Sequence, residues 1–344
     1  MPLMTGRGAI SVPTSVLVAP DSFKGSFMAV EVAVALQRGL AASGQPAEAC
    51  PVADGGEGTL AALSPAFGLE QVAARVSDPL GREIEARFGL GANGIAVVET
   101  ASASGLGLVS AGELDPVGAS TYGTGELLAA AVAAGAQTVY LAVGGSATTD
   151  GGAGAVRALQ GHGGLSGARL VVLCDVRTSF EGAAPTFAPQ KGASPEQVRV
   201  LQRRLDELAE TLPRDPRGVP MTGAAGGLAG GLWASFGAEL VAGAPFVLEA
   251  VGYDGRMRAS RAVITGEGCL DRQSLAGKLV GEVATRARQA GVPCHAVVGG
   301  NALSPFDMRI LDLQLVLEAT NLAELELAGA ELGAAIRAES ARGR

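Results

Sequence analysis

Uninterrupted apolar runs recur along this chain, and most of them alternate with stretches of helical patterning. The runs that predict buried strands are residues 15–20, 138–145, 169–176 and 261–268, followed by the segments VPCHAVVGG and LQLVLEA. Helical patterns cover about residues 28–42 and 277–290, and a final amphipathic pattern covers about 322–339. Apolar strands alternating with helices predict parallel sheets that are covered on both faces. We therefore expect an α/β protein.

Residues 72–100 follow a different pattern, in which short alternating strands are separated by turn signals. The signals are Asp78-Pro79-Leu80-Gly81 and Gly91-Ala92-Asn93-Gly94. Turns of this kind favour antiparallel hairpins, so a second unit of mixed α/β structure is expected to begin here. Because no Pro/Ser-rich linker separates the two units, we expect one domain to be inserted into the other.

Composition narrows the class of protein. The chain has 344 residues with 51 Gly, but 48% of its residues are apolar, which excludes collagen-like and disordered chains. Its net charge of −8 and its aromatic content of 4% argue against a nucleic-acid partner, which needs clustered basic residues and stacking rings. Anionic ligands are therefore expected to be bound by local groups.

Targeting and redox signals favour a cytoplasmic protein with no membrane partner. The N-terminal residues lack the pattern of a signal peptide, and residues 1–13 are expected to be a loose extension. The uncharged stretch 127–145 is Ala-rich and broken near Gly135, so it is interpreted as helix, turn and strand. The four cysteines are widely spaced and are expected to be mostly buried free thiols.

Glycines concentrate in turns that follow the predicted strands and that also carry charged or hydroxyl residues. These turns are APDSFKGS (19–26), ADGGEGT (53–59), STYGTGE (120–126), GGSATTDGGAG (144–154), FAPQKGA (187–193), GAAGGLAGG (223–231) and TGEGCLDRQSLAGK (265–278). Ligands of doubly wound folds bind beyond the carboxyl ends of strands, where exposed N–H groups attract anions. Several such turns predict a large polyanionic ligand or two ligands.

Several common chemistries lack their signatures. The sequence around Lys278 is a near miss to a P-loop, because Arg272 and Leu279 stand where Gly and Ser or Thr are required. No strand-following GxGxxG is present, which weakens a nicotinamide oxidoreductase. With only His162 and His295 in the chain, histidine-based, Ser-His-Asp and zinc catalysis are disfavoured.

The residue types left in the turns suit phosphoryl transfer, which needs cations near phosphates, carboxylates for Mg²⁺ and a carboxylate base. Lys24, Lys191 and Lys278 are the only lysines, and each lies in one of these turns. We interpret them as contacts to anionic ligand groups. A general preference for Arg is the alternative explanation.

The turn carboxylates can have structural or functional roles. Asp21, Asp54, Glu57 and Asp150 stand where helix caps are found, and capping and function can coexist. Asp175 ends a predicted strand, which favours a functional role. Glu267 and Asp271 are equally compatible with a local salt-bridge network that includes Lys278.

These motifs, in this order, closely resemble the bacterial glycerate kinase family over residues 15–319. The matching segments are VLVAPDSFKGS, ADGGEGT, STYGTGEL, GGSATTDGGAG, CDV, PQKGA, AAGGLAGGL and TGEGCLDRQSLAGK. The resemblance implies Mg²⁺- and ATP-dependent phosphorylation of D-glycerate, with 2-phosphoglycerate as the favoured product. It also implies a discontinuous Rossmann- or flavodoxin-like parallel-sheet domain, residues 14–66 and 255–344. A mixed α/β domain, residues 67–254, is expected to be inserted into it, with the active site in the cleft between them.

The chain departs from the family pattern at two places, of which the first is expected to shorten a surface loop and the second lies beside the expected site. The connection at residues 160–168 is short, and residues 177–180 read Arg-Thr-Ser-Phe where the family usually has Asn-Pro-Leu. Because of the second departure, the family pattern does not predict which residues beside Asp175 contact the acceptor, although Asp175 itself is present.

The roles that we expect follow from the motifs and the resemblance. The expected catalytic residues are Asp175 as the base, with Asp150 as second choice, and Lys24. The expected substrate- and nucleotide-binding residues are Asp21, Ser22, Lys24, Gly25, Gly55, Gly56, Gly145, Ser146, Thr148, Lys191, Thr265, Gly266, Asp271 and Lys278. The expected metal ligands are Asp54, Glu57 and Glu267, with Asp21 as a further candidate. Ser146 and Thr148, with backbone N–H groups of their turn, are expected to bind the glycerate carboxylate.

Three alternatives remain open at this point: a kinase for another small hydroxy acid, a catalytically silent nucleotide-binding protein, and a nicotinamide oxidoreductase. The sequence does not decide between phosphorylation at position 2 and position 3, nor between a monomer and a homodimer.

Overall fold

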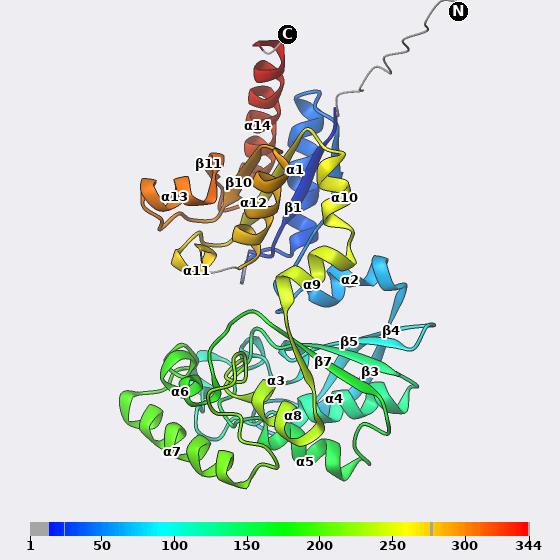
Figure 1. The fold of residues 1–344 in the computed structure, drawn as a ribbon, viewed down its shortest axis with the longest axis vertical. Helices are drawn as coiled ribbons and strands as arrows, with labels where there is room; N and C mark the ends of the chain where they lie inside the picture. Colours follow the sequence, from blue (N-terminus) through cyan, green and yellow to red (C-terminus); the bar gives the residue numbers. More distant parts are fainter. Residues whose placement is uncertain (1–13, 24, 276–277, 343–344) are drawn as a thin grey trace, which may run out of the picture. The chain divides into compact units, whose positions relative to one another are not determined.

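The structure, a computed structural model, describes residues 14–23, 25–275 and 278–342 (Figure 1). The chain divides into two compact units. The first runs up to Pro51 and resumes at Gly252, and the second spans Val52–Val251. The second unit therefore includes helix α2 (Thr59–Phe67), which packs against a strand of the second sheet, although the sequence had assigned it to the first domain.

The first unit contains a parallel sheet with the strand order β11-β10-β9-β1-β2. Its described strands are β1 (Val16–Pro20), β2 (Ala47–Ala49), β9 (Ala262–Glu267), β10 (Cys294–Val298) and β11 (Leu313–Glu318). Its described helices are α1 (Ala29–Ala42), α10 (Tyr253–Arg258), α11 (Arg272–Leu275), α12 (Leu279–Ala290), α13 (Pro305–Leu311) and α14 (Leu322–Arg342).

Counted within the unit alone, this strand order is 2-1-3-4-5, the doubly wound order of flavodoxin-like folds. Helices α1 and α14 lie side by side on one face of the sheet (Figure 1). They share an apolar core with Val16, Ile264 and Val297. Val280 of α12 and Leu311 of α13 pack with Ala296 and Val298 in a second core. Strands β1, β9 and β10 are thus buried on both faces, as predicted. The prediction was wrong for β11, which lies at the edge of the sheet and is partly exposed.

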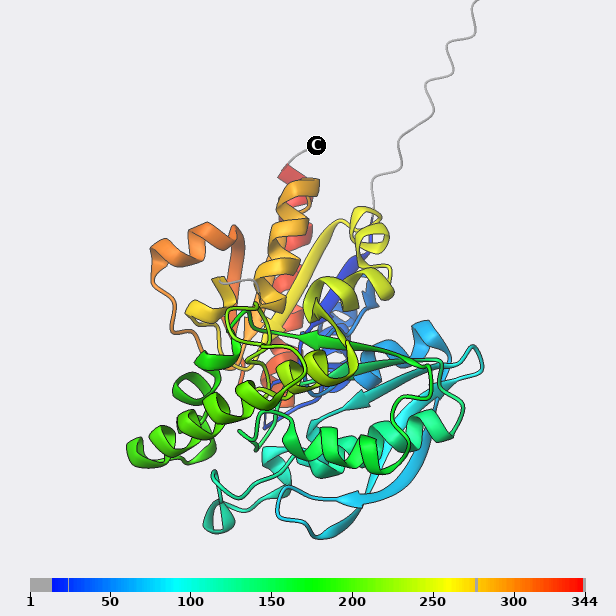
Figure 2. The ribbon, with the colours of Figure 1, turned by 60° about the horizontal axis from the view of Figure 1, so that its bottom comes forward.

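The second unit contains a mixed sheet with the order β3-β4-β5-β6-β7-β8. Its strands are β3 (Leu69–Ser77), β4 (Glu83–Gly91), β5 (Ile95–Glu99), β6 (Thr138–Ala142), β7 (Arg169–Cys174) and β8 (Glu239–Ala242). Besides α2, its helices are α3 (Ala101–Ser104), α4 (Tyr122–Ala133), α5 (Ala153–Gly161), α6 (Ala183–Phe187), α7 (Pro195–Thr211), α8 (Leu228–Phe236) and α9 (Gly243–Ala250). Figure 2 shows the long β3 and β4 strands of this sheet.

Strands β3, β4 and β5 are antiparallel, and β5 to β8 are parallel. The turn between β3 and β4 forms at the predicted signal because Asp78 Oδ1 accepts hydrogen bonds from Leu80 N–H (2.8 Å) and Arg82 N–H (2.9 Å). Gly81 in that turn has a φ of 83°, which glycine adopts at little cost. The expected hairpin region, residues 72–100, is confirmed.

Helix α7 illustrates how local sequence sets the limits of an element. Ser194 caps it by accepting a hydrogen bond from Gln197 N–H (3.2 Å), and Gln197 Oε1 accepts one from Ser194 N–H (2.9 Å). Pro195 occupies its first position, where the missing N–H costs nothing. Leu201, Leu205 and Ala209 recur at helical spacing and are buried on one side.

The cysteines are free, and Cys50, Cys174 and Cys294 are buried while Cys269 is exposed. Burial raises the pKa of the Cys50 thiol to about 11, which keeps it protonated near neutral pH.

Candidate active site

The parallel strands of the second unit end at one edge of their sheet, and most of the predicted groups of this unit follow those ends. Glu99 ends β5, Gly144 lies two residues beyond β6, Asp175 comes directly after β7, and Gly243 follows β8. In parallel sheets, this carboxyl edge is where ligands bind.

The Asp54–Gly56 turn lies against the same edge, in contact with backbone atoms. A Cβ atom on Gly243 would lie 2.1 Å from the carbonyl oxygen of Asp54, and one on Gly144 would lie 2.5 Å from Gly56 Cα. A Cβ on Gly55 would lie 3.0 Å from the carbonyl oxygen of Leu173, near the end of β7. Only glycine allows this close approach of backbone to backbone, which explains part of the glycine excess.

The two acidic residues of this turn differ in exposure. Asp54 is 3% exposed, and its Oδ1 accepts a hydrogen bond from Gly56 N–H (3.1 Å). Glu57 is exposed to solvent. Gly58, with a φ of 94°, then starts helix α2. The turn therefore contains one constrained carboxylate and one free to move in water.

Glu99 is a buried carboxylate that our sequence reasoning did not single out. Its Oε1 accepts a hydrogen bond from Leu60 N–H (2.8 Å). Burial raises the pKa of Glu99, while the backbone amides of Leu60, Gly58 and Thr59 oppose the shift and the charge of Glu57 adds to it. An acidic residue that ends an apolar strand, as in IAVVE, is the sequence signal that could have identified it.

The turn after β6 presents hydroxyl groups. Ser146 is 8% exposed and Thr148 is fully buried. The Oγ1 atoms of Thr100, Thr148 and Thr149 are buried without a hydrogen-bond partner among the described residues. Since native proteins seldom leave buried hydroxyls unpaired, these three groups mark a place where a ligand or water is needed.

Lys191 brings a positive charge to this turn. It ends the short 3₁₀ helix Pro189–Lys191 and is 6% exposed. Its Nζ donates hydrogen bonds to Ser146 Oγ (3.0 Å) and to the carbonyl oxygen of Thr148. Burial lowers the pKa of Lys191 to about 7, and the charge of Asp150 partly opposes this shift. Within the described part of the chain, Lys191 forms no ion pair, and the acceptors of its hydrogen bonds, Ser146 Oγ and the Thr148 carbonyl, are both neutral oxygens.

Asp150 is engaged in local structure. Its carboxylate accepts hydrogen bonds from the N–H groups of Thr121 (2.9 Å), Gly152 (3.0 Å) and Gly154 (3.1 Å) and from the Thr121 hydroxyl. It therefore binds amides at the start of α5 from a position two residues before the N-cap Gly152, which is a structural role of the kind that the sequence left open. Asp175 is half-buried at the end of β7, and its charge adds to the effect of burial in raising the pKa of Cys174.

The unusual residues 177–180 are used in packing. Phe180 is fully buried against Leu201 and Leu205 of α7, and its ring lies where side chains on Gly227 or Gly230 would be. The carbonyl oxygen of Thr178 accepts a hydrogen bond from Gly223 N–H (2.9 Å). Phe180 thus belongs to a core cluster and contributes no polar group to the strand ends.

In the first unit, the predicted groups lie at the switch point between β1 and β9, where ligands of this fold class bind. Asp21 is 5% exposed; its N–H donates to the carbonyl oxygen of Gly266 (2.8 Å), and its Oδ1 accepts from Ser22 N–H (2.7 Å). The Thr265 hydroxyl donates to the carbonyl oxygen of Ala19 (3.0 Å), which joins the ends of the two strands.

A second set of groups follows β9. Glu267 Oε1 accepts a hydrogen bond from the Ser274 hydroxyl (2.5 Å), and Asp271 N–H donates to Ser274 Oγ (3.2 Å). Lys278 occupies the N-cap position of α12 and is half-buried. Gly25, in the turn that follows β1, has a φ of 79°. Its neighbour Lys24 lies outside the described residues, so the expected role of Lys24 stays a prediction.

The predicted metal ligands are divided between the two units, with Asp54 and Glu57 in the second and Glu267 in the first. No group of three His, Cys, Asp or Glu side chains suited to holding a metal ion occurs among the described residues. Mg²⁺ in nucleotide-dependent enzymes is bound by one or two carboxylates together with substrate phosphates. The constrained Asp54 carboxylate fits this mode, and a site made wholly of protein ligands does not.

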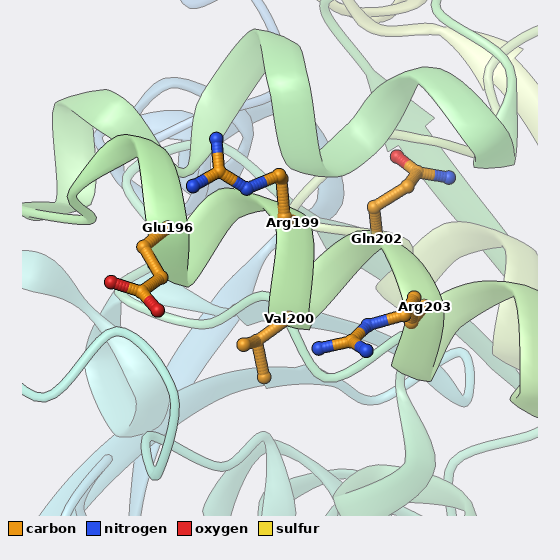
Figure 3. A pocket seen from close by; sticks show the side chains of 5 residues that line it. All are labelled: Glu196, Arg199, Val200, Gln202 and Arg203. Carbon is orange, nitrogen blue, oxygen red and sulfur yellow. The ribbon is translucent and has the colours of Figure 1, made fainter.

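A separate hollow of 480 Å³ lies along α7, where Glu196, Arg199, Val200, Gln202 and Arg203 line it (Figure 3). It is lined by none of the predicted site residues. In addition, no helix in the described ranges is both long and apolar enough to cross a membrane.

The architecture and the strand-end groups define a two-unit α/β protein whose Gly-rich turns carry carboxylates, hydroxyls and lysines. A family model described as the glycerate kinase family matches residues 16–163 and 160–324. The chain belongs to the glycerate kinase family.

Individual relatives agree with this assignment. The chain is 38% identical to a glycerate kinase of Halalkalibacterium halodurans over 83% of its length and 85% of that relative. It is 37% identical to a glycerate 2-kinase of Escherichia coli over 83% of its length and 84% of that relative. A solved structure assigned to glycerate kinase 2 of Salmonella typhimurium superposes with a TM-score of 0.78 and 32% identity, covering 95% of this chain and 99% of that one.

Proposed function

We propose that this protein is a glycerate kinase that transfers the γ-phosphoryl group of ATP to a hydroxyl of D-glycerate, with Mg²⁺ and with 2-phosphoglycerate as the product. Membership of the glycerate kinase family supports the substrate class. The observation that carries the proposal is Lys191, a buried cation whose described partners are two neutral oxygens at the turn after β6. Such a charge is costly to bury and is stabilised by an anionic ligand.

The acceptor carboxylate is the anion that we assign to this turn. The N–H group of Gly145 and the hydroxyls of Ser146 and Thr148 supply donors, and Thr148 Oγ1 has no other partner among the described residues. Because the Lys191 ammonium can only donate, Ser146 Oγ accepts from it, and the Ser146 hydroxyl hydrogen is left to point elsewhere. Ser146 is then oriented to donate to a carboxylate oxygen.

Asp175 is our choice for the base. It accepts the proton of the attacking glycerate hydroxyl while the new O–P bond forms and the bond from γ-phosphorus to the β-phosphate oxygen breaks, releasing ADP. Its position directly after β7 suits this role. Asp150 is the weaker candidate because its oxygens already accept hydrogen bonds from Thr121, Gly152 and Gly154.

We assign the nucleotide phosphates to the switch point of the first unit, between β1 and β9. Asp21, Ser22, Thr265, Gly266 and Asp271 lie there, and Lys278 occupies the N-cap position of helix α12. Lys24 and Gly25 belong to the same turn in sequence. A bound Mg²⁺ would neutralise charge on the phosphates, and one or two of the candidate carboxylates Asp54, Glu57 and Glu267 would hold it.

The product of a reaction with ATP, Mg²⁺ and D-glycerate tests the proposal directly. ³¹P and ¹H NMR should identify 2-phosphoglycerate. 3-Phosphoglycerate would correct the position of transfer, and faster turnover of lactate, tartronate or erythronate would replace the acceptor. ATP binding in calorimetry without product from any of these acids would favour a silent nucleotide-binding protein.

A further inference from the structure

The junction of strand β5 and helix α2 contains a buried carboxylate with no place in the mechanism above. Glu99 is 9% exposed and lies at the last position of β5. It accepts a hydrogen bond from Leu60 N–H (2.8 Å) at the start of α2. The first N–H groups of a helix have no partner within the helix, and their combined dipole favours a negative charge. Glu99 supplies both the partner and the charge.

The preceding turn is held on its other side by backbone contacts. Gly56 and Gly144 meet with almost no space between them, and the amide of Gly144 donates to the carbonyl oxygen of Gly55 (3.4 Å). Gly243 lies so close to the carbonyl oxygen of Asp54 that a Cβ atom would not fit between them. The segment from Asp54 to Gly58 is therefore restrained at one end by the glycines that follow β6 and β8 and at the other by Glu99.

The bond between Glu99 and the start of α2 affects whether the ADGGEGT motif can bind a phosphate. A Gly-rich turn that enters a helix is a common phosphate site because the helix amides are vacant. Here the amide of Leu60 is already bonded to Glu99, and that of Thr59 donates to the carbonyl oxygen of Gly56 (3.3 Å). A phosphate would have to displace a buried carboxylate to bind at this helix end.

We propose that Glu99 is a positioning residue that occupies the N-terminus of α2, fixes the Asp54–Glu57 segment for phosphoryl transfer, and keeps this helix end from binding a phosphate. The inference rests on the proposed function for its catalytic part only. The segment's contribution is then the Asp54 carboxylate, and the phosphates are bound by other turns.

Hydrogen–deuterium exchange of the full-length protein tests the anchoring without any assay of activity. Replacing Glu99→Ala should speed amide exchange in a peptide covering residues 57–63 by about 10- to 100-fold, since charge-assisted hydrogen bonds are lost. Formate, which can enter the space left by the side chain, should slow that exchange again in Glu99→Ala and have no effect on the wild type. Glu99→Gln keeps one acceptor oxygen and should be intermediate.

Glu126→Gln is the matched control, because Glu126 Oε2 accepts a hydrogen bond from Ser77 N–H (2.6 Å) away from the turn. It should leave exchange at residues 57–63 unchanged. Unchanged exchange there in Glu99→Ala, or failure of formate to slow it, would overturn the anchoring role.

The catalytic part is tested by kinetics on the same variants. We expect kcat of Glu99→Ala to fall about 10- to 100-fold with the KM for the acceptor within about twofold, and formate to recover part of the loss. An equal loss in Glu126→Gln, or a raised acceptor KM with unchanged kcat, would overturn the positioning role. If the wild type phosphorylates no hydroxy acid while exchange responds as expected, the proposed function fails and the anchoring stands.

Discussion

The strand-end turns of both units carry carboxylates, but among the described residues only the second unit also has a buried lysine there. In the second unit, a buried ammonium, Lys191, is bonded to neutral oxygens beside threonine hydroxyls that lack a partner among the described residues. In the first unit, the buried group at the switch point is a carboxylate, Asp21, and Glu267 accepts a hydrogen bond from Ser274. The second unit is thus arranged to receive an anion, and the first offers oxygen ligands and amides. This difference is our reason for assigning the acceptor acid to the second unit and the nucleotide to the first.

The largest effect that we expect comes from removing the proposed base in the second unit. Asp175→Asn keeps the shape of the side chain but cannot accept the hydroxyl proton, so kcat should fall by about 10²- to 10⁴-fold. The thermal unfolding midpoint should stay near that of the wild type. Stopped-flow or coupled measurement of ADP release, together with circular dichroism, checks both.

Two variants make this test specific. Asp150→Asn alters a carboxylate that organises the start of α5, so it should lower the unfolding midpoint more than Asp175→Asn does. Asp115→Asn, at an exposed position, should change neither activity nor stability. Turnover of Asp175→Asn close to that of the wild type would remove Asp175 from the mechanism and leave Asp150 to be tested as the base.

Replacing one lysine in each unit should affect the KM for a different substrate. Lys191→Met should raise the KM for the acceptor acid about 10- to 100-fold, because a donor to Ser146 and a buried positive charge are lost. Lys278→Met should instead raise the KM for ATP. Steady-state kinetics with each substrate varied in turn measures both, and the same pattern in the two variants would contradict the assignment of ligands to units.

The pH dependence of Lys191 gives an independent measurement. Burial lowers its pKa to about 7 from an ordinary value near 10.5, so between these values the unfolded chain binds a proton that the folded chain does not. Stability of the second unit should therefore rise with pH across this window, by about 1.4 kcal/mol per pH unit at most. The acceptor KM should rise over the same range, as the ammonium is lost.

Lys191→Met should abolish the rise in stability while keeping or increasing stability at pH 7, since a costly buried charge is replaced by an apolar side chain. Denaturant titrations followed by the fluorescence of Trp233, the only tryptophan and a residue of α8, report on the second unit. A wild-type stability that is flat or falls between pH 7 and 10 would contradict the lowered pKa of the buried Lys191 side chain.

The fold could be predicted in detail because its signals are local. The strand run 261–268 and the helical pattern 277–290 correspond to β9 and α12, and the turn signal at Asp78 forms the β3–β4 turn. These elements follow from apolar periodicity and turn chemistry, which neighbouring residues determine. The start of the second unit at Val52 was missed because helix α2 has no local signal of which sheet it packs against.

The site could be predicted only where a motif contains its own chemistry. The turns with Ser146, Lys191 and Asp54 could be proposed as parts of the candidate site because glycines cluster there around polar and charged side chains. Glu99 was missed because its partner amides, near residue 60, are 39 positions away in sequence. The bond from Lys191 to Ser146 joins residues 45 positions apart, so the two appeared as separate candidates. Pairings of this kind depend on tertiary contacts, which a single sequence does not specify.

The smallest effect that we expect is a loss of stability at mildly acid pH caused by the buried His295. It again allows the two units to be compared, since His295 lies in the first unit and His162 in the second. His295 on β10 is 1% exposed, and neither ring nitrogen has a partner among the described residues. Burial lowers its pKa below the ordinary 6.5, with the charge of Glu339 opposing the shift. The folded chain therefore binds a proton at His295 less readily than the unfolded chain does, and stability is lost as pH falls below about 6.5.

The first unit of the wild type should accordingly lose up to about 1.4 kcal/mol per pH unit on mild acidification. His295→Leu should remove this dependence and raise stability at pH 5.5, because it also replaces two unpaired buried nitrogens by carbon. The matched control is His162→Leu, since His162 is exposed and its Nδ1 lies 2.8 Å from the carbonyl oxygen of Ala158. Exchange of amides in β10, compared with those in β6, measures the loss in each unit. Equal acid sensitivity of β6 and β10, or a wild-type response that persists in His295→Leu, would show that carboxylates and not this imidazole set the acid stability of the first unit.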